Sequence, residues 1–270
     1  YAEDLRIDFS ILDQHAESYR KIRNTFRYLL GNINDDKEEI DLEKIDINNF
    51  PELEQFMLHK IYLLNENFKM YFRNYDFHNL YKELLNFCTV DLSAFYFDIR
   101  KDCLYCDPVD SKKRQSTILL LKVILTSLLR WFAPILSFTT EEIYKIVGSK
   151  KSIHLENFVD FPISFKNDKL FLKWKELIKI RDICNLQIEK QRTEKLIGSS
   201  LEAELKIKLN NDKINLFKDI DFAELCITSL AIVKQGENDT VEAEASKAQG
   251  VKCPVCWKIS PDLCKRHGIE

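Results

Sequence analysis

The feature that most constrains the fold is the segment KKRQSTILLLKVILTSLLRWF at residues 112–132, which is almost wholly apolar on three sides after its basic first turn. Its apolar side chains point in three directions around a helix, so packing against a single neighbour cannot bury them. Ser111 or Asp110 precedes the stretch as a potential N-cap, and Pro134 follows it as a helix breaker. The stretch is therefore predicted to be the central helix of a bundle.

Further amphipathic helices are predicted on both sides of this central segment. Apolar residues recur at helical spacing in four other stretches, and most of their ends are marked by a capping residue, a proline or a glycine. Ser10 is the expected cap of the first helix, and Thr139 or Thr140 that of the last. The stretches cover residues 10–31, 51–75, 76–108 and 139–147. Long helices with short connections favour an antiparallel bundle, which we assign to residues 1–151.

The second half of the chain predicts a smaller α/β subdomain. Residues 152–168 are irregular and are expected to be a linker. Residues 169–248 are expected to begin with a long helix over residues 170–195. Strands should follow, since apolar and polar residues alternate in EAELKIKL, in FAELCIT and around residues 240–245. Residues 249–270 then form a separate tail.

The tail holds four potential metal ligands in two pairs of equal spacing, Cys253 with Cys256 and Cys264 with His267. A CxxC turn can direct both thiolates into one tetrahedral site, and the CxxH pair can close it from the other side. The alternative is a chance clustering of cysteines near a chain end. Because four protein ligands leave no position for water, we predict one structural Zn²⁺.

These expectations together define the fold class. The chain is predicted to be mainly α, with an antiparallel helix bundle followed by a long helix, a small α/β subdomain and a C-terminal zinc knuckle. A chain of 270 residues with 45% apolar content is long enough to bury a sizeable core in one large domain or two smaller ones.

A basic segment raises the question of a polyanionic partner. Residues 111–151 contain eight Lys and Arg residues and two Glu residues, although the whole chain has a formal net charge of -3. Such a segment is typical either of a solvated helix face or of a nucleic-acid-binding surface. Aromatic rings near basic side chains, such as Trp131 beside Arg130, can stack on unpaired nucleotides, but single aromatic residues more often pack in a core. The sequence pattern leaves both interpretations open.

No catalytic motif is recognisable in the sequence. The five histidines are scattered, the six glycines form no phosphate-binding loop, and there is no GxSxG motif. A second CxxC pair, Cys103 with Cys106, lacks a second ligand pair, so we predict neither a redox nor a metal-binding role for it.

The sequence also suggests a reducing compartment. Eight cysteines in a long, Lys-rich chain without a secretory signal favour the cytoplasm over secretion. No membrane span is expected, because Lys122, Arg130 and Pro134 interrupt the longest apolar run. The chain starts with Tyr1 and not with Met, which we interpret as an excised part of a longer protein.

Five segments, in order along the chain, resemble the C-terminal part of bacterial isoleucyl-tRNA synthetases, a family of class I aminoacyl-tRNA synthetases. They are YRKIRNTFRYLLGNIND at residues 19–35, DLSAFYFDIRKDCLYCDP at 91–108, APILSFTTEEIY at 133–144, IGSSLEAEL at 197–205, and the CPVCW tail. The tail after an IGSSLEA segment is particular to the isoleucine branch, so the related valyl- and leucyl-tRNA synthetases are less similar. The resemblance covers nearly the whole chain.

The resemblance implies a tRNA-binding function. The bundle would hold the anticodon region of isoleucine tRNA, and the zinc tail would help to hold the anticodon loop. ATP and Mg²⁺ would belong to a catalytic domain with HIGH and KMSKS motifs, which this sequence lacks, so the chain alone should be inactive. A cytoplasmic monomer that binds neither DNA nor membrane is expected. The candidate tRNA-binding residues are Arg23, Arg27, Arg100, Lys101, Lys112, Lys113, Arg114, Arg130, Trp131 and Trp257.

Two departures from the family pattern affect these expectations. The family tail usually has a second CxxC after a longer spacer, whereas here His267 stands where the last cysteine is expected. Histidine is a competent zinc ligand, so three thiolates and one imidazole can still complete the site. Position 103 is commonly basic, which supports Cys103 as an incidental substitution. The alternative to tRNA binding is a helical scaffold whose zinc tail recruits a protein partner.

Overall fold

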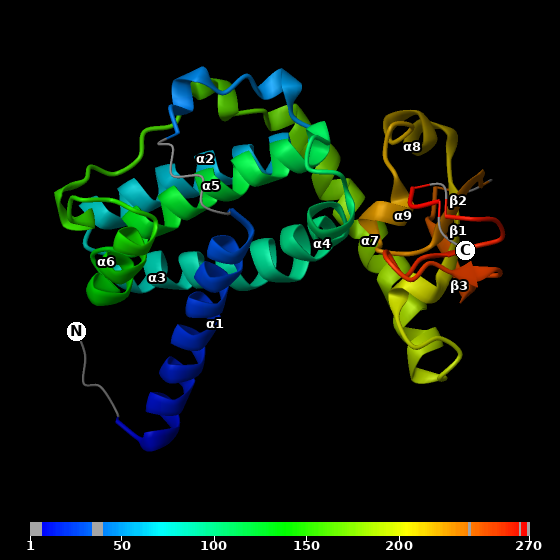
Figure 1. Cartoon of the computed structure of the whole chain (residues 1–270), viewed down its shortest axis with the longest axis horizontal. Coiled ribbons are helices and arrows are strands. Elements are labelled where there is room, and N and C mark those ends of the chain that lie inside the picture. The colour runs from blue at the N-terminus through cyan, green and yellow to red at the C-terminus, as the bar shows by residue number, and fades with distance from the viewer. Residues whose placement is uncertain (1–6, 34–39, 237–238, 265, 269–270) are drawn as a thin grey trace. The chain divides into compact units, whose positions relative to one another are not determined.

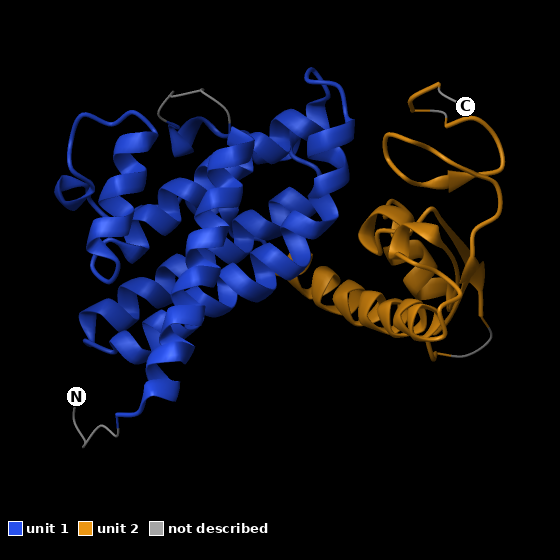
Figure 2. Cartoon of the chain, turned by 60° about the horizontal axis from the view of Figure 1, so that its bottom comes forward, with its two compact units in different colours: residues 1–167 blue, residues 168–270 orange. Residues whose placement is uncertain are grey.

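The computed structural model describes residues 7–33, 40–236, 239–264 and 266–268. The chain divides into two compact units, residues 1–167 and residues 168–270 (Figure 2). The first unit is helical, and the second combines one long helix with a small sheet. The finer boundaries at residues 151 and 248 remain predictions.

The first unit is built around α5, Lys112–Phe132, as the sequence predicts (Figure 1). Ser111 caps this helix, and its hydroxyl accepts a hydrogen bond from the Arg114 backbone N–H. Neighbouring helices α1, Phe9–Ile33, and α2, Glu52–Arg73, both pack on α5. Because helices contact it on several sides, more than half of its residues are buried.

The burial of α5 also bears on the question of a membrane. By length and composition alone this helix is long and apolar enough to cross a bilayer, in spite of Lys122 and Arg130. Most of its apolar stretch, however, is buried inside the bundle. That burial is typical of the core helix of a globular unit.

The remaining helical elements of the first unit complete the bundle. Three of them form one continuous path, because Phe87 and Asp98 at the two junctions keep helical dihedral angles. Its middle third is a π-helix, a difference from the regular helix that the spacing predicts. The continuous path consists of α3, Phe77–Asn86, the π-helix η3, Phe87–Phe97, and α4, Asp98–Cys106. The other elements are α6, Ser137–Ile146, and 3-10 turns at Leu42–Lys44, Ile47–Asn49, Ile153–Leu155 and Ile163–Phe165.

A buried ion pair links the helices of this core. The Arg100 side chain on α4 donates from Nε and from one terminal nitrogen to the two carboxylate oxygens of Glu54 on α2, both at 2.6 Å. Tyr96 from η3 and Thr117 from α5 donate hydroxyl hydrogen bonds to the same carboxylate. The Glu54 side chain is fully buried and that of Arg100 is 3% exposed. Four elements thus meet at one carboxylate.

Two helix starts differ from the predicted ones. The first helix begins at Phe9, and the Asp8 carboxylate, in place of Ser10, accepts a backbone hydrogen bond at this end. Helix α6 begins at Ser137, so Thr139 and Thr140 lie inside it. Thr140 is buried, and its hydroxyl bonds back to the Leu136 carbonyl. A threonine hydroxyl can satisfy a carbonyl inside a helix as well as cap one, and the sequence pattern does not separate these roles.

The second unit places a three-stranded sheet against α7, Asp168–Thr193. The central strand β1, Ala203–Leu209, pairs in parallel with β2, Leu230–Gln235, and antiparallel with β3, Glu242–Lys247. Alternate residues of β1 are fully buried, which agrees with the period of two in the sequence. The short 3-10 element η6, Ser200–Glu202, leads into β1, and the short helices α8, Asn211–Leu216, and α9, Phe222–Leu225, connect β1 to β2.

The strand predicted for FAELCIT was wrong, because this segment contains α9. The Asp221 carboxylate accepts hydrogen bonds from the backbone N–H groups of Ala223 and Glu224, which starts a helical turn. The buried residues Phe222, Leu225 and Cys226 also fit helical spacing. A short apolar run satisfies both periods, and the preceding cap decides between them.

The buried ion pair gives a prediction about stability. Glu54→Gln should destabilise the protein by about 3–5 kcal/mol, because the Arg100 guanidinium stays buried without its counter-charge. Arg20→Gln, which removes an exposed pair with Glu17, should cost less than about 1 kcal/mol. Urea unfolding followed by circular dichroism measures both values. Equal effects of the two variants would contradict this account of the core.

Candidate metal centre and nucleic-acid interface

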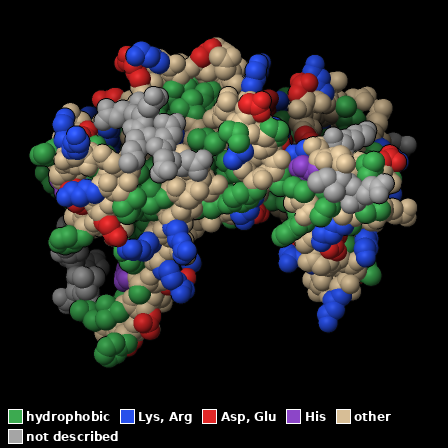
Figure 3. Space-filling view, in the orientation of Figure 1, with side chains coloured by type: hydrophobic (Ala, Val, Ile, Leu, Met, Phe, Trp, Pro, Cys, Tyr) green, Lys and Arg blue, Asp and Glu red, His purple; other side chains and the backbone are tan. Residues whose placement is uncertain are grey.

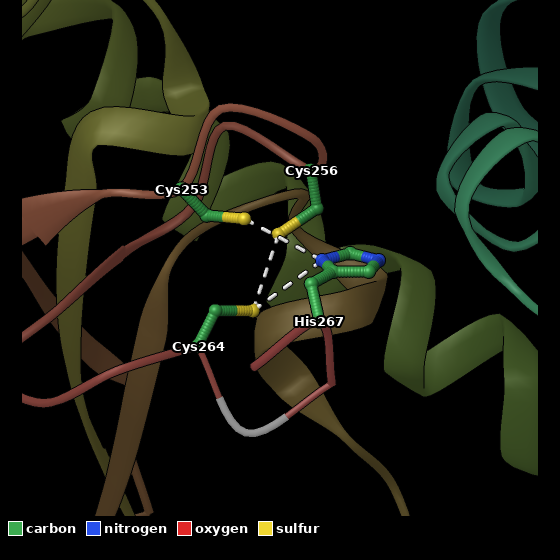
Figure 4. A group of neighbouring side chains, drawn as sticks. All are labelled: Cys253, Cys256, Cys264 and His267. Carbon is green, nitrogen blue, oxygen red and sulfur yellow. Dashed lines mark hydrogen bonds between the residues drawn. The ribbon is translucent and has the colours of Figure 1, made fainter. Parts of the chain in front are cut away.

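The four predicted metal ligands converge in the C-terminal tail (Figure 4). A two-stranded hairpin, β4, Val251–Lys252, and β5, Ile259–Ser260, holds Cys253 and Cys256 in its turn. Cys264 and His267 come from the loop that follows β5. One ligand atom from each residue lies within 4.8 Å of all the others. The structure therefore brings all four together, and they could hold a metal ion.

The distances between the ligand atoms fit a tetrahedral ion. The two sulfurs of Cys256 and Cys264 lie 3.9 Å apart, and His267 Nδ1 lies 3.4 Å from the sulfurs of Cys253 and Cys264. Zinc bonds of about 2.3 Å to sulfur and about 2.0–2.1 Å to nitrogen imply about 3.8 Å between two sulfurs and about 3.6 Å between sulfur and nitrogen. The Nδ1 atom of His267 therefore lies where the fourth ligand of such an ion would be.

A backbone hydrogen bond and burial shift the pKa values of two thiols of this cluster in opposite directions. The Cys256 N–H group lowers the pKa of the Cys253 thiol to about 6, so this sulfur is an anion at neutral pH. Burial raises the pKa of the Cys256 thiol to about 11, so this group keeps its proton in the absence of a cation. A bound metal cation would favour its thiolate form, because metal binding and thiol deprotonation are coupled.

Gly250 is a part of the centre that sequence reasoning missed. Its φ angle is +125°, and a Cβ atom at this position would lie 2.0 Å from the Ser260 carbonyl oxygen. Only glycine lets the chain enter β4 this close to β5. The available signal was a glycine three residues before a CxxC pair. Trp257 also has a positive φ, +62°, directly after the ligand Cys256.

Trp257 is displayed on the surface beside the metal cluster. Its side chain is 60% exposed, and the Lys252 ammonium lies 6.0 Å from the centroid of its ring. The hairpin is held next to the start of β2 in the same unit, since the Ile259 N–H donates to the hydroxyl of Ser229, the residue before β2, at 2.6 Å. This arrangement presents a flat aromatic face next to a positive charge, as base stacking requires.

Arg23 and Arg27 lie on the exposed side of α1, and Figure 3 shows Lys and Arg side chains gathered over the middle of this helix. Arg23 donates to the Tyr19 hydroxyl at 3.1 Å and lies 3.7 Å from a Glu142 carboxylate oxygen. The hydrogen bond to Tyr19 raises the pKa of Arg23, so its charge is permanent. Both side chains are accessible to an anion.

The basic residues near the start of α5 differ in how accessible they are. Lys112 is exposed, while Lys113 and Arg114 are half-buried, and Arg114 donates to the Asp107 carbonyl at 3.0 Å. Lys101 on α4 is exposed and pairs with Asp98 at 2.9 Å. Their roles as phosphate contacts remain predictions. Arg130 is half-buried and lies 3.5 Å from Glu156.

Two predicted contact residues are unsuited to binding RNA. Arg100 is the buried partner of Glu54, and its guanidinium has no open path to a phosphate. Trp131 is fully buried, and its Nε1–H donates to the Asn65 side-chain oxygen at 3.0 Å. The two predictions were wrong because a basic and an aromatic residue served the core, a use that the sequence pattern does not distinguish from a surface role.

The second CxxC pair lies at the end of α4. Cys103 is buried and Cys106 is half-buried. Burial raises the pKa of the Cys103 thiol to about 12, so this sulfur keeps its proton at neutral pH. Within the described residues, neither sulfur belongs to a group of three or more potential metal ligands.

Comparison with known proteins gives a family match. The model of the anticodon-binding domain of tRNA ligases matches residues 54–208, from α2 to β1. An isoleucine-tRNA ligase from Pelagibacter ubique is 63% identical over 99% of this chain, and those from Caldicellulosiruptor saccharolyticus and Agrobacterium fabrum are 39% and 37% identical over 99% and 97%. The chain spans about 30% of the length of these relatives.

The cluster geometry predicts a tetrahedral complex with a spectroscopic probe. Co²⁺ added to the protein should give one equivalent of a complex with sulfur-to-metal charge transfer and tetrahedral d–d bands, because three sulfurs and one nitrogen converge on one point. The Cys256→Ser variant should lose these bands, whereas Cys103→Ser should keep them. Retention of the bands in Cys256→Ser, or their loss in Cys103→Ser, would contradict the ligand set.

Proposed function

The chain belongs to the family of anticodon-binding domains of tRNA ligases, and on this premise we propose that it is the tRNA-binding C-terminal region of an isoleucine-tRNA ligase. The observation that carries the proposal is the agreement of two findings. The family match covers the bundle from α2 onward, and relatives that align along nearly the whole chain are isoleucine-tRNA ligases. This agreement favours the isoleucine branch over valyl- or leucyl-tRNA synthetases.

The proposed partner is isoleucine tRNA, bound at its anticodon region. The exposed cations Arg23, Arg27, Lys101 and Lys112 would hold phosphates, since such contacts position an RNA without reading its sequence. Lys113, Arg114 and Arg130 are half-buried and would contribute less. The exposed ring of Trp257 would stack on a base that is splayed out of the anticodon loop.

The metal in this proposal is one structural Zn²⁺. The donor set of three sulfurs and one Nδ1 suits zinc, and four protein ligands leave no position for a catalytic water. Cys253, Cys256, Cys264 and His267 would hold the ion and thereby fix the turn that displays Trp257. Metal binding would thus act on RNA binding through the conformation of the tail.

The aminoacylation reaction would belong to other parts of a longer ligase. ATP and Mg²⁺ would bind there, since this sequence contains neither a HIGH nor a KMSKS motif. We propose that the present chain is inactive alone, and that the ligase acts in the cytoplasm as a monomer. A helical scaffold for a protein partner is the alternative.

Salt-dependent binding of an isoleucine tRNA transcript tests the proposal. Affinity should fall steeply between 50 and 200 mM salt, because phosphate contacts release counterions. Arg27→Gln should weaken binding of every tRNA sequence and reduce the slope of log affinity against log salt by about 1. Lys44→Gln, the same charge change at an exposed residue paired with Asp41, should change neither quantity. Filter binding and fluorescence anisotropy measure both.

The proposal has clear contrary outcomes. Absence of tRNA binding even at low salt would refute it. Aminoacylation of tRNA by this chain alone would refute the proposal that the reaction belongs to other parts of a longer ligase. A stable protein complex together with equal indifference to tRNA and other RNA would favour the scaffold.

A further inference from the structure

The turn that leads into β1 is linked to both strands of the hairpin that carries two of the metal ligands. This turn is η6, which lies within IGSSLEAEL at residues 197–205. Glu202 Oε1 in the turn lies 3.4 Å from the ammonium nitrogen of Lys252 in β4. The Leu201 carbonyl accepts a hydrogen bond from the hydroxyl of Ser229, and the same hydroxyl accepts a backbone N–H of β5. The turn therefore holds the hairpin at two points, one on each strand.

Both oxygens of the Glu202 carboxylate have partners. While Oε1 faces Lys252, Oε2 accepts the backbone N–H of Gly198 at 3.0 Å. This hydrogen bond lowers the pKa of the Glu202 carboxyl, so the group is charged at neutral pH. The Glu202 side chain is 22% exposed and that of Lys252 is 49% exposed. An ion pair as accessible as this one adds little stability, so its effect lies in where it places the ammonium group.

Lys252 in turn lies over the ring of Trp257. Its ammonium nitrogen is 6.0 Å from the centroid of the ring, and cation–π contacts extend to about 6 Å. The Trp257 backbone N–H donates to the Cys253 carbonyl at 2.9 Å, which fixes the backbone of this residue in the hairpin turn. The freedom left to the ring is that of its side-chain torsions, and a cation held over one face restricts them.

We propose that Glu202 is a positioning residue, which acts through Lys252 to set the orientation of the Trp257 ring. The carboxylate holds the ammonium over the ring, and the ammonium favours the side-chain rotamer that keeps the ring beneath it. For RNA binding the inference rests on the proposed function, in which this ring stacks on a base. A ring that is already oriented loses less conformational entropy when a base binds, so affinity rises without a further contact.

Acrylamide quenching of tryptophan fluorescence tests the positioning without RNA. Trp131 and Trp174 are 0% and 3% exposed, so this neutral quencher reports on Trp257, which is 60% exposed. In the zinc-loaded chain, Glu202→Gln should increase the quenching constant, because a neutral amide no longer holds Lys252 over the ring. The amide still offers an oxygen to the backbone N–H that Oε2 now accepts, so the turn itself should be kept.

Matched variants complete the quenching comparison. Glu204→Gln makes the same charge change at a neighbouring residue whose carboxylate lies 3.8 Å from the Lys206 ammonium, and it should leave the quenching constant unchanged. Lys252→Gln should increase the constant, and adding Glu202→Gln to it should have no further effect, because the two residues act as one unit. Additive effects of the two substitutions would overturn the inference.

Binding of the anticodon arm of isoleucine tRNA separates positioning from simple electrostatics. Glu202→Gln removes a negative charge, so electrostatics alone would strengthen RNA binding. The inference predicts the opposite, a loss of about 2- to 5-fold, since orientation contributes no more than the cation–π contact that maintains it. Lys252→Arg keeps a cation that can pair with the same carboxylate and lie over the ring, so it should retain the affinity of the unaltered chain.

The remaining outcomes are distinguishable. Glu202→Gln should still give the tetrahedral bands of one equivalent of Co²⁺, and their loss would overturn the inference, because the carboxylate would then support the metal cluster itself. Stronger RNA binding by Glu202→Gln, or quenching equal to that of Glu204→Gln, would also overturn the inference and leave the proposed function intact. No RNA binding by the unaltered chain would overturn the proposed function, and the quenching comparison would still decide how the ring is positioned.

Discussion

The helical unit depends on the Glu54 carboxylate, which is fully buried and accepts hydrogen bonds from three other elements of the bundle. Burying a charge there costs free energy unless every partner is in position. The Glu54–Arg100 ion pair therefore favours one alignment of α2, η3, α4 and α5. Burial also raises the pKa of Tyr96, so its hydroxyl remains a neutral donor to this carboxylate. The exposed Lys101 and Lys112 lie on α4 and α5, two of the helices that the Glu54 carboxylate connects. The distance between these two cations therefore depends on a contact in the core.

The sequence predicted the architecture better than the surface. The apolar stretch of α5 and the alternation in β1 each allow one arrangement, because burying that many apolar side chains requires it. Arg100 and Trp131 were predicted to contact RNA because a basic or an aromatic side chain can serve either the surface or the core. Only their partners Glu54 and Asn65 decide between these two roles. Those partners lie 46 and 66 residues away in the chain. Local patterns cannot reveal contacts at such separations.

The convergence of the four candidate metal ligands was predictable from the sequence, because four residues with fixed spacing encode it locally. Its supporting geometry was less so. The positive φ of Trp257 and the close approach at Gly250 follow from the tight hairpin, and they turn an aromatic side chain outward beside the cluster. A tail of this kind has little apolar core of its own, so a bound ion would supply much of the energy that orders it. The RNA-binding role proposed for Trp257 therefore depends on the metal.

The central claim is that this chain recognises the anticodon region of a tRNA, and backbone footprinting tests it most directly. Isoleucine tRNA is cleaved with hydroxyl radicals in the presence and absence of the zinc-loaded protein at low salt. The account predicts protection confined to the anticodon stem and loop, with weaker loop protection after zinc is removed. Protection centred on the acceptor stem, or a uniform pattern along the whole tRNA, would contradict it.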